Sequence, residues 1–226
     1  MDVLRERCGL REGAAVLELG PGPGTATRRL LELGADPLVA VEPNETAVAY
    51  LVEATGGAVE VLVEPFEEVR LPRSFDLVVA ATSFHWIDPE PGLPKVFAAL
   101  RRDGWFATWA NIHGDLTGDD AFHRATQEVL GPTPEAPWPQ FTDDEANARM
   151  LSAAGFVDVE YELLRSSLRF DSAGIRALYA TFSNIERRPA DERDRILDEL
   201  ERIAEDAFCG AVERAILTTL YSARKP

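Results

Sequence analysis

The fold is decided by the stretch Val16-Leu17-Glu18-Leu19-Gly20-Pro21-Gly22-Pro23-Gly24-Thr25. An apolar run ends in closely spaced glycines, and an amphipathic run begins directly after them. Because glycine lacks a Cβ atom, the backbone can turn sharply there and approach a ligand closely. Free amides at the start of the following helix can hold an anionic group. The stretch therefore predicts a strand, a glycine-rich loop and a helix around a ligand crevice, although a tight turn without a ligand is the simpler alternative.

Short β-branched runs alternate with longer amphipathic runs around this stretch, which is typical of an α/β fold with a doubly wound parallel sheet. We expect strands at residues 14–19, 37–41, 58–63, 75–80 and 104–109, and helices at residues 25–33, 45–54 and 93–100. The apolar content of the third and fourth strands predicts that both are interior strands.

The second half of the chain has a different pattern. Residues 131–139 are rich in proline and cannot form regular secondary structure, so we expect a connection that can act as a lid. Residues 156–163 alternate apolar and acidic side chains, which is typical of a half-exposed antiparallel strand. Residues 215–221 are expected to pair with that strand, and two helices are expected between them.

Two features near the glycine-rich loop bear on the cofactor. The dinucleotide pattern Gly-x-Gly-x-x-Gly requires a third glycine where this sequence has Thr25. Glu18 precedes the loop by two residues, so a diphosphate would face a carboxylate there. S-adenosyl-L-methionine (SAM) suits such a site better, because its ammonium can pair with Glu18 while its carboxylate binds the loop amides. We therefore predict SAM as the cofactor.

A second acid, Glu42, lies just past the second expected strand. Its carboxylate can accept hydrogen bonds from both ribose hydroxyls of a cofactor, although this feature fits SAM and NAD equally well. A solvated acid at a helix N-terminus is the structural alternative for Glu42. An NAD-dependent oxidoreductase and a non-catalytic SAM-binding module therefore stay open beside an enzyme that uses SAM.

Residues 18–24, 41–43, 75–79 and 83–86 resemble conserved motifs of the class I SAM-dependent methyltransferases. The similarity is greatest to the small-molecule branch that includes trans-aconitate methyltransferase-like proteins, and it covers nearly the whole chain. It implies a Rossmann-like seven-stranded sheet, mostly parallel with an antiparallel C-terminal strand and helices on both faces. It also implies methyl transfer from SAM to a small-molecule acceptor.

The predicted cofactor-binding residues come from the loop, the ribose turn and the strand ends. They are Glu18, Gly20, Pro21, Gly22, Gly24, Glu42, Pro43, Phe66, Glu67, Ala81 and Ser83. By the resemblance Phe66 and Glu67 contact adenine, although Pro65 stands where the family commonly has an acidic residue and donates no amide. The alternative for Glu67 is a solvent-exposed surface residue with no role in binding.

The resemblance also implies an N-terminal segment that helps cover SAM, whereas about a dozen residues precede the first expected strand here. We expect either another subunit or the loop of residues 132–139 to close the site. A shortened chain that binds the cofactor weakly is the alternative.

Side chains after the fourth and fifth strands are the candidates for acceptor chemistry. His85 is a candidate catalytic base and Trp86 a candidate acceptor wall or cation-π partner, because both follow the strand end where the methyl group should point. A packed, hydrogen-bonded histidine is the alternative for His85. Trp109, Asn111 and His113 are further candidates on the same topological reasoning, and Asn111 can instead cap a turn.

Composition limits the classes of partner. The net charge of −16 and the absence of a Lys/Arg run argue against nucleic acid, as does the absence of the Asn/Asp-Pro-Pro-aromatic pattern of base-amino methylases after the fourth strand. Cys8 and Cys209 lack metal-ligand spacing, and no signal or membrane-spanning segment is apparent. We therefore expect no metal, no membrane partner and a cytoplasmic location.

The length of 226 residues allows one substantial hydrophobic core. We expect a single domain over residues 1–226. Residues 1–112 would form its cofactor-binding core, and residues 113–226 would hold a helical insertion and the last two strands.

Overall fold

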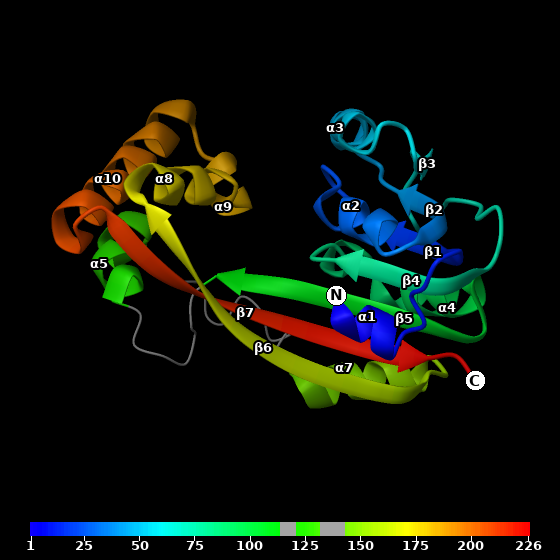
Figure 1. The fold of residues 1–226 in the computed structure, drawn as a ribbon. Coiled ribbons are helices and arrows are strands. Elements are labelled where there is room, and N and C mark those ends of the chain that lie inside the picture. The colour runs from blue at the N-terminus through cyan, green and yellow to red at the C-terminus, as the bar shows by residue number, and fades with distance from the viewer. Residues whose placement is uncertain (114–120, 132–142) are drawn as a thin grey trace. The chain divides into compact units, whose positions relative to one another are not determined.

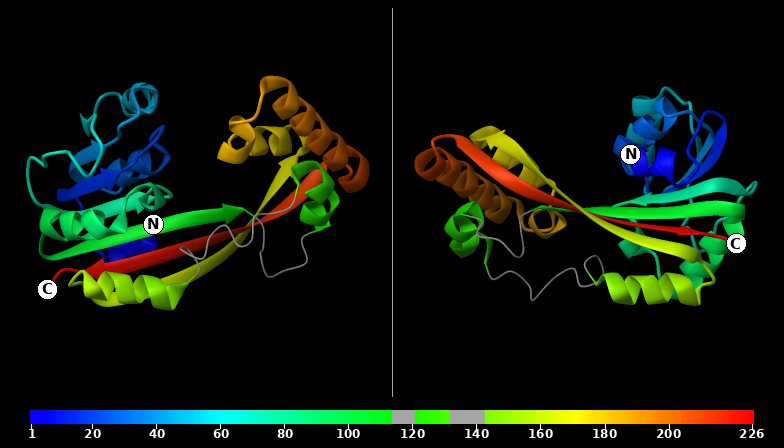
Figure 2. Two further views of the ribbon diagram at one scale, coloured as in Figure 1. Left: turned by 180° about the vertical axis from the view of Figure 1, so that it is seen from behind. Right: turned by 60° about the horizontal axis from the view of Figure 1, so that its bottom comes forward.

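The computed structural model describes residues 1–113, 121–131 and 143–226, which contain one seven-stranded sheet with helices around it (Figure 1). The strands are β1 (Ala14–Leu19), β2 (Ala35–Val41), β3 (Glu60–Leu62), β4 (Phe75–Ala81), β5 (Leu100–His113), β6 (Val157–Asp171) and β7 (Ala211–Arg224). Their order across the sheet is β3-β2-β1-β4-β5-β7-β6. Strands β1 to β5 are parallel, whereas β7 runs against its neighbours β5 and β6 (Figures 1 and 2). The predicted fold class is therefore confirmed.

The described helices are α1 (Asp2–Glu6), α2 (Thr25–Glu32), α3 (Glu45–Thr55), α4 (Pro89–Ala99), α5 (Ala121–Leu130), α7 (Asp144–Ala153), α8 (Ser172–Ala180), α9 (Ser183–Glu186) and α10 (Ala190–Phe208), with a 3₁₀ turn η1 at Phe84–Trp86. Helices α2, α3 and α4 lie on the two faces of the parallel strands, as the alternating runs predict. Val16 of β1 packs in one core cluster with Leu30 of α2 and Leu51 of α3. Leu17 packs in the other, with Val96 of α4. Successive side chains of β1 thus point to opposite faces of the sheet.

The chain forms two compact units. The first contains the described residues of 1–110, 140–162 and 219–226, and its core is made by the two clusters on either side of β1. The second contains the described residues of 111–139 and 163–218. Its core joins apolar side chains of α5, α8 and α10. A single domain over residues 1–226 stays a prediction.

Three details differ from the sequence-based expectations. The third strand is an edge strand and not an interior one, because β3 has only three residues and ends the strand order, with Glu60 exposed. Three described helices, not two, connect β6 to β7. Strand β6 is an edge strand of 15 residues, longer than the predicted segment at 156–163. The predicted lid at 131–139 lies outside the described residues, except for Gly131.

Candidate functional site

The carboxyl ends of three parallel strands bring the predicted cofactor residues to one edge of the sheet. Leu19, the last residue of β1, lies opposite Val41 on β2 and Ala80 on β4. The loop after β1, the acid after β2 and the turn after β4 therefore begin at the same level. This is where open α/β sheets bind their ligands.

The loop between β1 and α2 needs glycine at three positions. Gly20, Gly22 and Gly24 have φ angles of +60°, +55° and +86°, a region that other residues rarely adopt. A Cβ on Gly20 would lie 2.6 Å from Cβ of Ser83, and one on Gly24 would lie 2.8 Å from Cδ1 of Leu51. A Cβ on Gly22 would meet no atom within 4 Å. Packing thus excludes side chains at the loop's two ends, and its middle faces open space.

Glu18 is the most unusual residue of the site. It is 0% exposed, and among the described residues neither carboxylate oxygen has a hydrogen-bond partner. Burial raises the pKa of Glu18 from 4.5 to about 7, and the nearby hydroxyl of Thr27 opposes this rise only in part. A buried acid without a partner is costly for the folded protein. The arrangement fits a cationic ligand group such as the ammonium of an amino acid.

Thr27 is a residue that the sequence analysis missed. Its side chain is fully buried on the first turn of α2, and its Oγ1 also has no hydrogen-bond partner within the described part of the chain. The sequence did contain a signal for Thr27, because a threonine on the buried face of the first helical turn places a hydroxyl close to the end of β1. The glycine pattern predicts only how the loop backbone contributes to the site, and it does not predict a role for this side chain.

Glu42 holds the loop in place from the neighbouring strand. It is 8% exposed, and its Oε2 accepts a hydrogen bond from the amide of Gly22 at 3.2 Å. Its Oε1 accepts one from the amide of Asn44 at 3.0 Å, across the exposed Pro43. Each carboxylate oxygen has a second lone pair. Glu42 can therefore support the loop and still accept hydrogen bonds from ribose hydroxyls.

The end of β4 is tied to the glycine-rich loop. Ser83 is buried, and its hydroxyl donates a hydrogen bond to the carbonyl oxygen of Leu19. A cofactor contact from this side chain would therefore use its oxygen as an acceptor. Ala81 is half-buried and pairs with Trp109 on β5, and the amide of Thr82 donates to the Trp109 carbonyl at 2.7 Å. Buried Pro21 completes the loop, since its carbonyl accepts from the Gly24 amide at 3.1 Å.

The two residues expected to contact adenine, Phe66 and Glu67, differ in burial. The Phe66 side chain is buried in the core under Lys95, whose Nζ lies 5.2 Å from the ring centroid. Phe66 can thus offer a base its backbone, not its ring. Glu67 is exposed, and its Oε1 accepts a long hydrogen bond of 3.4 Å from the amide of Asp88 at the start of α4.

His85 and Trp86 lie in the turn η1 directly after β4. Their ring centroids are 4.6 Å apart. Trp86 is 68% exposed, whereas His85 is half-buried and burial lowers its pKa below the ordinary value of 6.5. The imidazole is therefore neutral at neutral pH and can accept a proton. An exposed indole beside it offers a flat apolar surface.

The candidates on β5 are only partly brought to this site. Trp109 is half-buried and packs against the core cluster that contains Val16. Asn111 belongs to the second compact unit, where its Oδ1 accepts a hydrogen bond from Thr218 at 2.7 Å. A role of Asn111 toward an acceptor stays a prediction. The side chain of His113 lies outside the described part of the structure.

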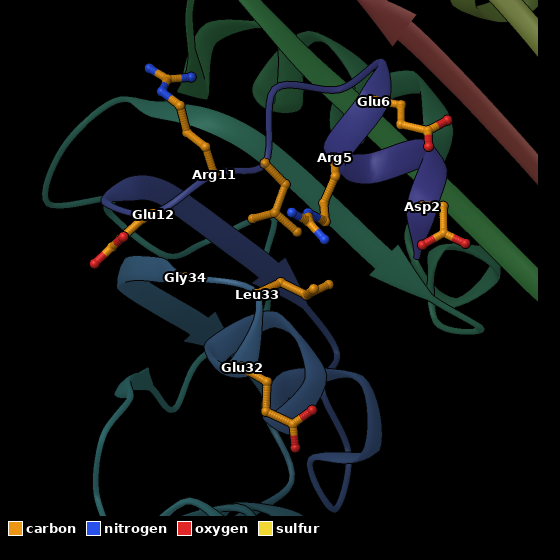
Figure 3. A pocket seen from close by; sticks show the side chains of 9 residues that line it. Asp2, Arg5, Glu6, Arg11, Glu12, Glu32, Leu33 and Gly34 are labelled. Carbon is orange, nitrogen blue, oxygen red and sulfur yellow. The ribbon is translucent and has the colours of Figure 1, made fainter.

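A separate hollow of about 780 Å³ lies at the opposite, amino-terminal ends of β1 and β2 (Figure 3). It is lined by Asp2, Arg5, Glu6, Leu10, Arg11, Glu12, Glu32, Leu33 and Gly34. Figure 3 shows α1 on one side of it and the end of α2 on the other. Its side chains are mostly charged and carry both signs. The hollow shares no residue with the site at the carboxyl ends.

Two other kinds of feature are absent from the described residues. No group of three or more His, Cys, Asp or Glu side chains is arranged to hold a metal ion there. None of the helices in residues 1–113, 121–131 and 143–226 combines the length and apolar content that a bilayer crossing requires.

Comparison with known proteins agrees with the geometry. Residues 17–108 match the family described as "Methyltransferase domain". An uncharacterized methyltransferase of Schizosaccharomyces pombe is 25% identical over 98% of this chain and 88% of its own length. The ribosomal RNA small subunit methyltransferase A of Rhodopseudomonas palustris is 51% identical over 132 residues, which cover 58% of this chain and 35% of that protein.

The fold is also shared with a solved methyltransferase. The phosphoethanolamine N-methyltransferase 2 of Haemonchus contortus, solved with phosphomonomethylethanolamine and S-adenosylhomocysteine, superimposes with a TM-score of 0.59 at 16% identity. The match covers 99% of this chain and 52% of the nematode enzyme, so this chain spans about half of that protein's length. This chain is thus similar to a methyltransferase domain over residues 17–108, and it shares the fold of a solved methyltransferase.

Proposed function

We propose that this enzyme methylates a small-molecule acceptor with SAM bound at the carboxyl ends of β1, β2 and β4. The observation that carries the proposal is the fully buried Glu18 carboxylate, whose oxygens have no partner among the described residues. When bound, SAM supplies an electrophilic methyl group on a sulfonium. The protein's own task is to orient the two reactants, exclude water and accept a proton where the acceptor requires it.

Each end of the cofactor has a matching group in the chain. The ammonium of the amino acid tail would pair with Glu18, and the tail's carboxylate would bind amides of the loop from Gly20 to Gly24. The ribose hydroxyls would donate to Glu42, which already contacts the loop through Gly22. Ser83, Ala81 and the backbone around Phe66 complete the proposed cofactor site.

The acceptor would lie against η1. Trp86 offers it an exposed aromatic face, and Trp109 is the next aromatic residue along this edge. The Nδ1 atom of His85 is buried, so Nε2 is the nitrogen that would take a proton from the acceptor. Because burial lowers the pKa of His85, its neutral form is available throughout the neutral range.

A small molecule is favoured over nucleic acid by charge. The chain has a net charge of −16, which disfavours the approach of a polyanion. The partial similarity to ribosomal RNA methyltransferases makes RNA the second candidate, and it should be tested beside small molecules. The trans-aconitate methyltransferase-like branch and a cytoplasmic location stay predictions from the sequence.

The acceptor class is tested by following the methyl label. The enzyme is incubated with methyl-labelled SAM and either a small-molecule cell extract or purified small-subunit ribosomal RNA. We expect label in the fraction of small molecules and none in the RNA. Label found in RNA alone would contradict the proposal and support the second candidate.

Replacement of His85 by Gln tests the proposed base. If His85 removes a proton, kcat should fall about 10²- to 10⁴-fold while the affinity for S-adenosylhomocysteine is unchanged. The wild-type rate should rise with pH up to the lowered pKa of His85, below 6.5, and then level off. His123→Gln is the matched control, because it makes the same substitution on α5, outside η1. An unaltered kcat in the Gln variant would leave His85 as a packing residue.

Replacement of Glu42 by Ala tests the ribose contact. The variant should bind S-adenosylhomocysteine more weakly by about 1 to 3 kcal/mol, or roughly 5- to 150-fold, as titration calorimetry would measure. Glu45→Ala is the control, because it removes the same charge from an exposed position three residues along the chain. Equal affinities for the two variants would exclude Glu42 from the site.

Glu18→Gln should make the cofactor-free protein more stable at alkaline pH. The folded-state pKa of Glu18 is raised, so the wild type loses stability as the pH rises from about 4.5 through about 7. Above that range the variant should gain at most about 3 kcal/mol in free energy of unfolding. Urea titrations near pH 5 and near pH 8, with Glu45→Gln as an exposed control, measure the difference. A gain that is equal at both pH values would show that Glu18 does not titrate in this range.

A further inference from the structure

We propose that binding of the cofactor's amino group is coupled to the release of one proton from Glu18, and that Thr27 positions the Glu18 carboxylate for this exchange. The inference rests on the function proposed above and adds a dependence on pH at the same site. It concerns how the empty site and the filled site differ in charge, not which acceptor is methylated.

The geometry isolates Glu18 from water and, among the described residues, leaves the Thr27 hydroxyl as the polar side chain beside it. Because side chains alternate along a strand, Glu18 points to the same face of β1 as Val16, which packs with Leu30 and Leu51. The carboxylate is 0% exposed, and the Thr27 hydroxyl, which also has no hydrogen-bond partner among the described residues, lowers its pKa from nearby. An ionised carboxylate in these surroundings is unfavourable unless a cation arrives.

Among the residues that the structure describes, no charged side chain of the neighbouring elements balances Glu18. The charged groups on the elements that pack beside β1 are Asp2, Arg5 and Glu6 on α1, Arg28, Arg29 and Glu32 on α2, Asp36 on β2, Glu42 after β2, Asp76 on β4, and Glu45 and Glu53 on α3. None of them contributes to the pKa of Glu18, which burial raises to about 7 and the Thr27 hydroxyl partly lowers. The carboxyl group is therefore largely protonated in the empty site on the acidic side of neutrality.

The proton balance of binding follows from this state. The ligand arrives with a protonated amino group, and an ion pair in a buried site favours the carboxylate form of Glu18. The O–H bond of the Glu18 carboxyl group breaks and its proton passes to the solvent, while the ligand keeps its own protons. 5′-Methylthioadenosine, which has the adenosine part but no amino acid tail, should bind without this release.

Titration calorimetry measures the released proton directly. Binding enthalpies of S-adenosylhomocysteine at about pH 6.5 are compared in buffers that differ in ionisation enthalpy. We expect S-adenosylhomocysteine to release up to one proton for each ligand bound, and 5′-methylthioadenosine to release none. S-adenosylhomocysteine that binds without proton release would overturn the inference but leave the proposed function intact. Failure of both ligands to bind would overturn the proposed function as well.

The affinity for S-adenosylhomocysteine should change with pH as Glu18 of the empty site loses its proton. The association constant for S-adenosylhomocysteine should rise roughly tenfold between about pH 6 and about pH 8, because the empty site no longer has to lose a proton. The Glu18→Gln variant should bind S-adenosylhomocysteine more weakly and without releasing a proton. Its association constant should vary little over this pH range. A profile that stays as steep in this variant would assign the proton to another group and overturn the inference.

The role of Thr27 is tested by the pH midpoint of the affinity profile and not by the affinity itself. Thr27→Val keeps the shape of the side chain and removes the hydroxyl that lowers the pKa of Glu18, so the midpoint of the affinity profile should move to higher pH. Thr27→Ser should restore the wild-type midpoint. A merely structural role would weaken binding at all pH values equally. An unmoved midpoint in the Val variant would overturn the role of Thr27.

Discussion

The buried carboxylate of Glu18 is the constraint around which this end of the sheet is arranged. A strand that is otherwise apolar carries it into the interior, where burial raises its pKa to about 7. Gly20 and Gly24 let the chain leave β1 in a tight loop that packs against Ser83 and Leu51. The first turn of α2 then brings Thr27 beside the acid. The protein keeps a group that disfavours folding where a cationic ligand would need it.

The rest of the site is held in place by its own hydrogen bonds. Glu42 fixes the loop through the Gly22 amide, and Ser83 ties the end of β4 to the end of β1. A loop that is already held in one conformation loses little conformational freedom when a ligand binds. The same residues that a cofactor would contact thus also maintain the shape of the crevice. This double role fits the burial of Glu42, whereas Glu18 is buried without a partner in the described structure.

The sequence predicted what short-range chemistry determines. The glycine pattern located the loop, and the apolar run of β1 gave that strand's limits correctly. The place of β3 at the sheet edge could not be predicted, because its apolar residues resemble those of an interior strand while strand order depends on distant pairings. The burial of the Phe66 ring and the approach of Thr27 to Glu18 likewise depend on tertiary packing. Periodicity locates such residues on an element, but it does not show which groups they meet.

A structure of the protein with S-adenosylhomocysteine bound tests the central claim most directly. The account predicts that the ligand's amino nitrogen lies within hydrogen-bonding distance of the Glu18 carboxylate, with its carboxylate at amides of the loop from Gly20 to Gly24. A bound ligand whose amino group lies elsewhere, with Glu18 still sealed and without a partner, would contradict it.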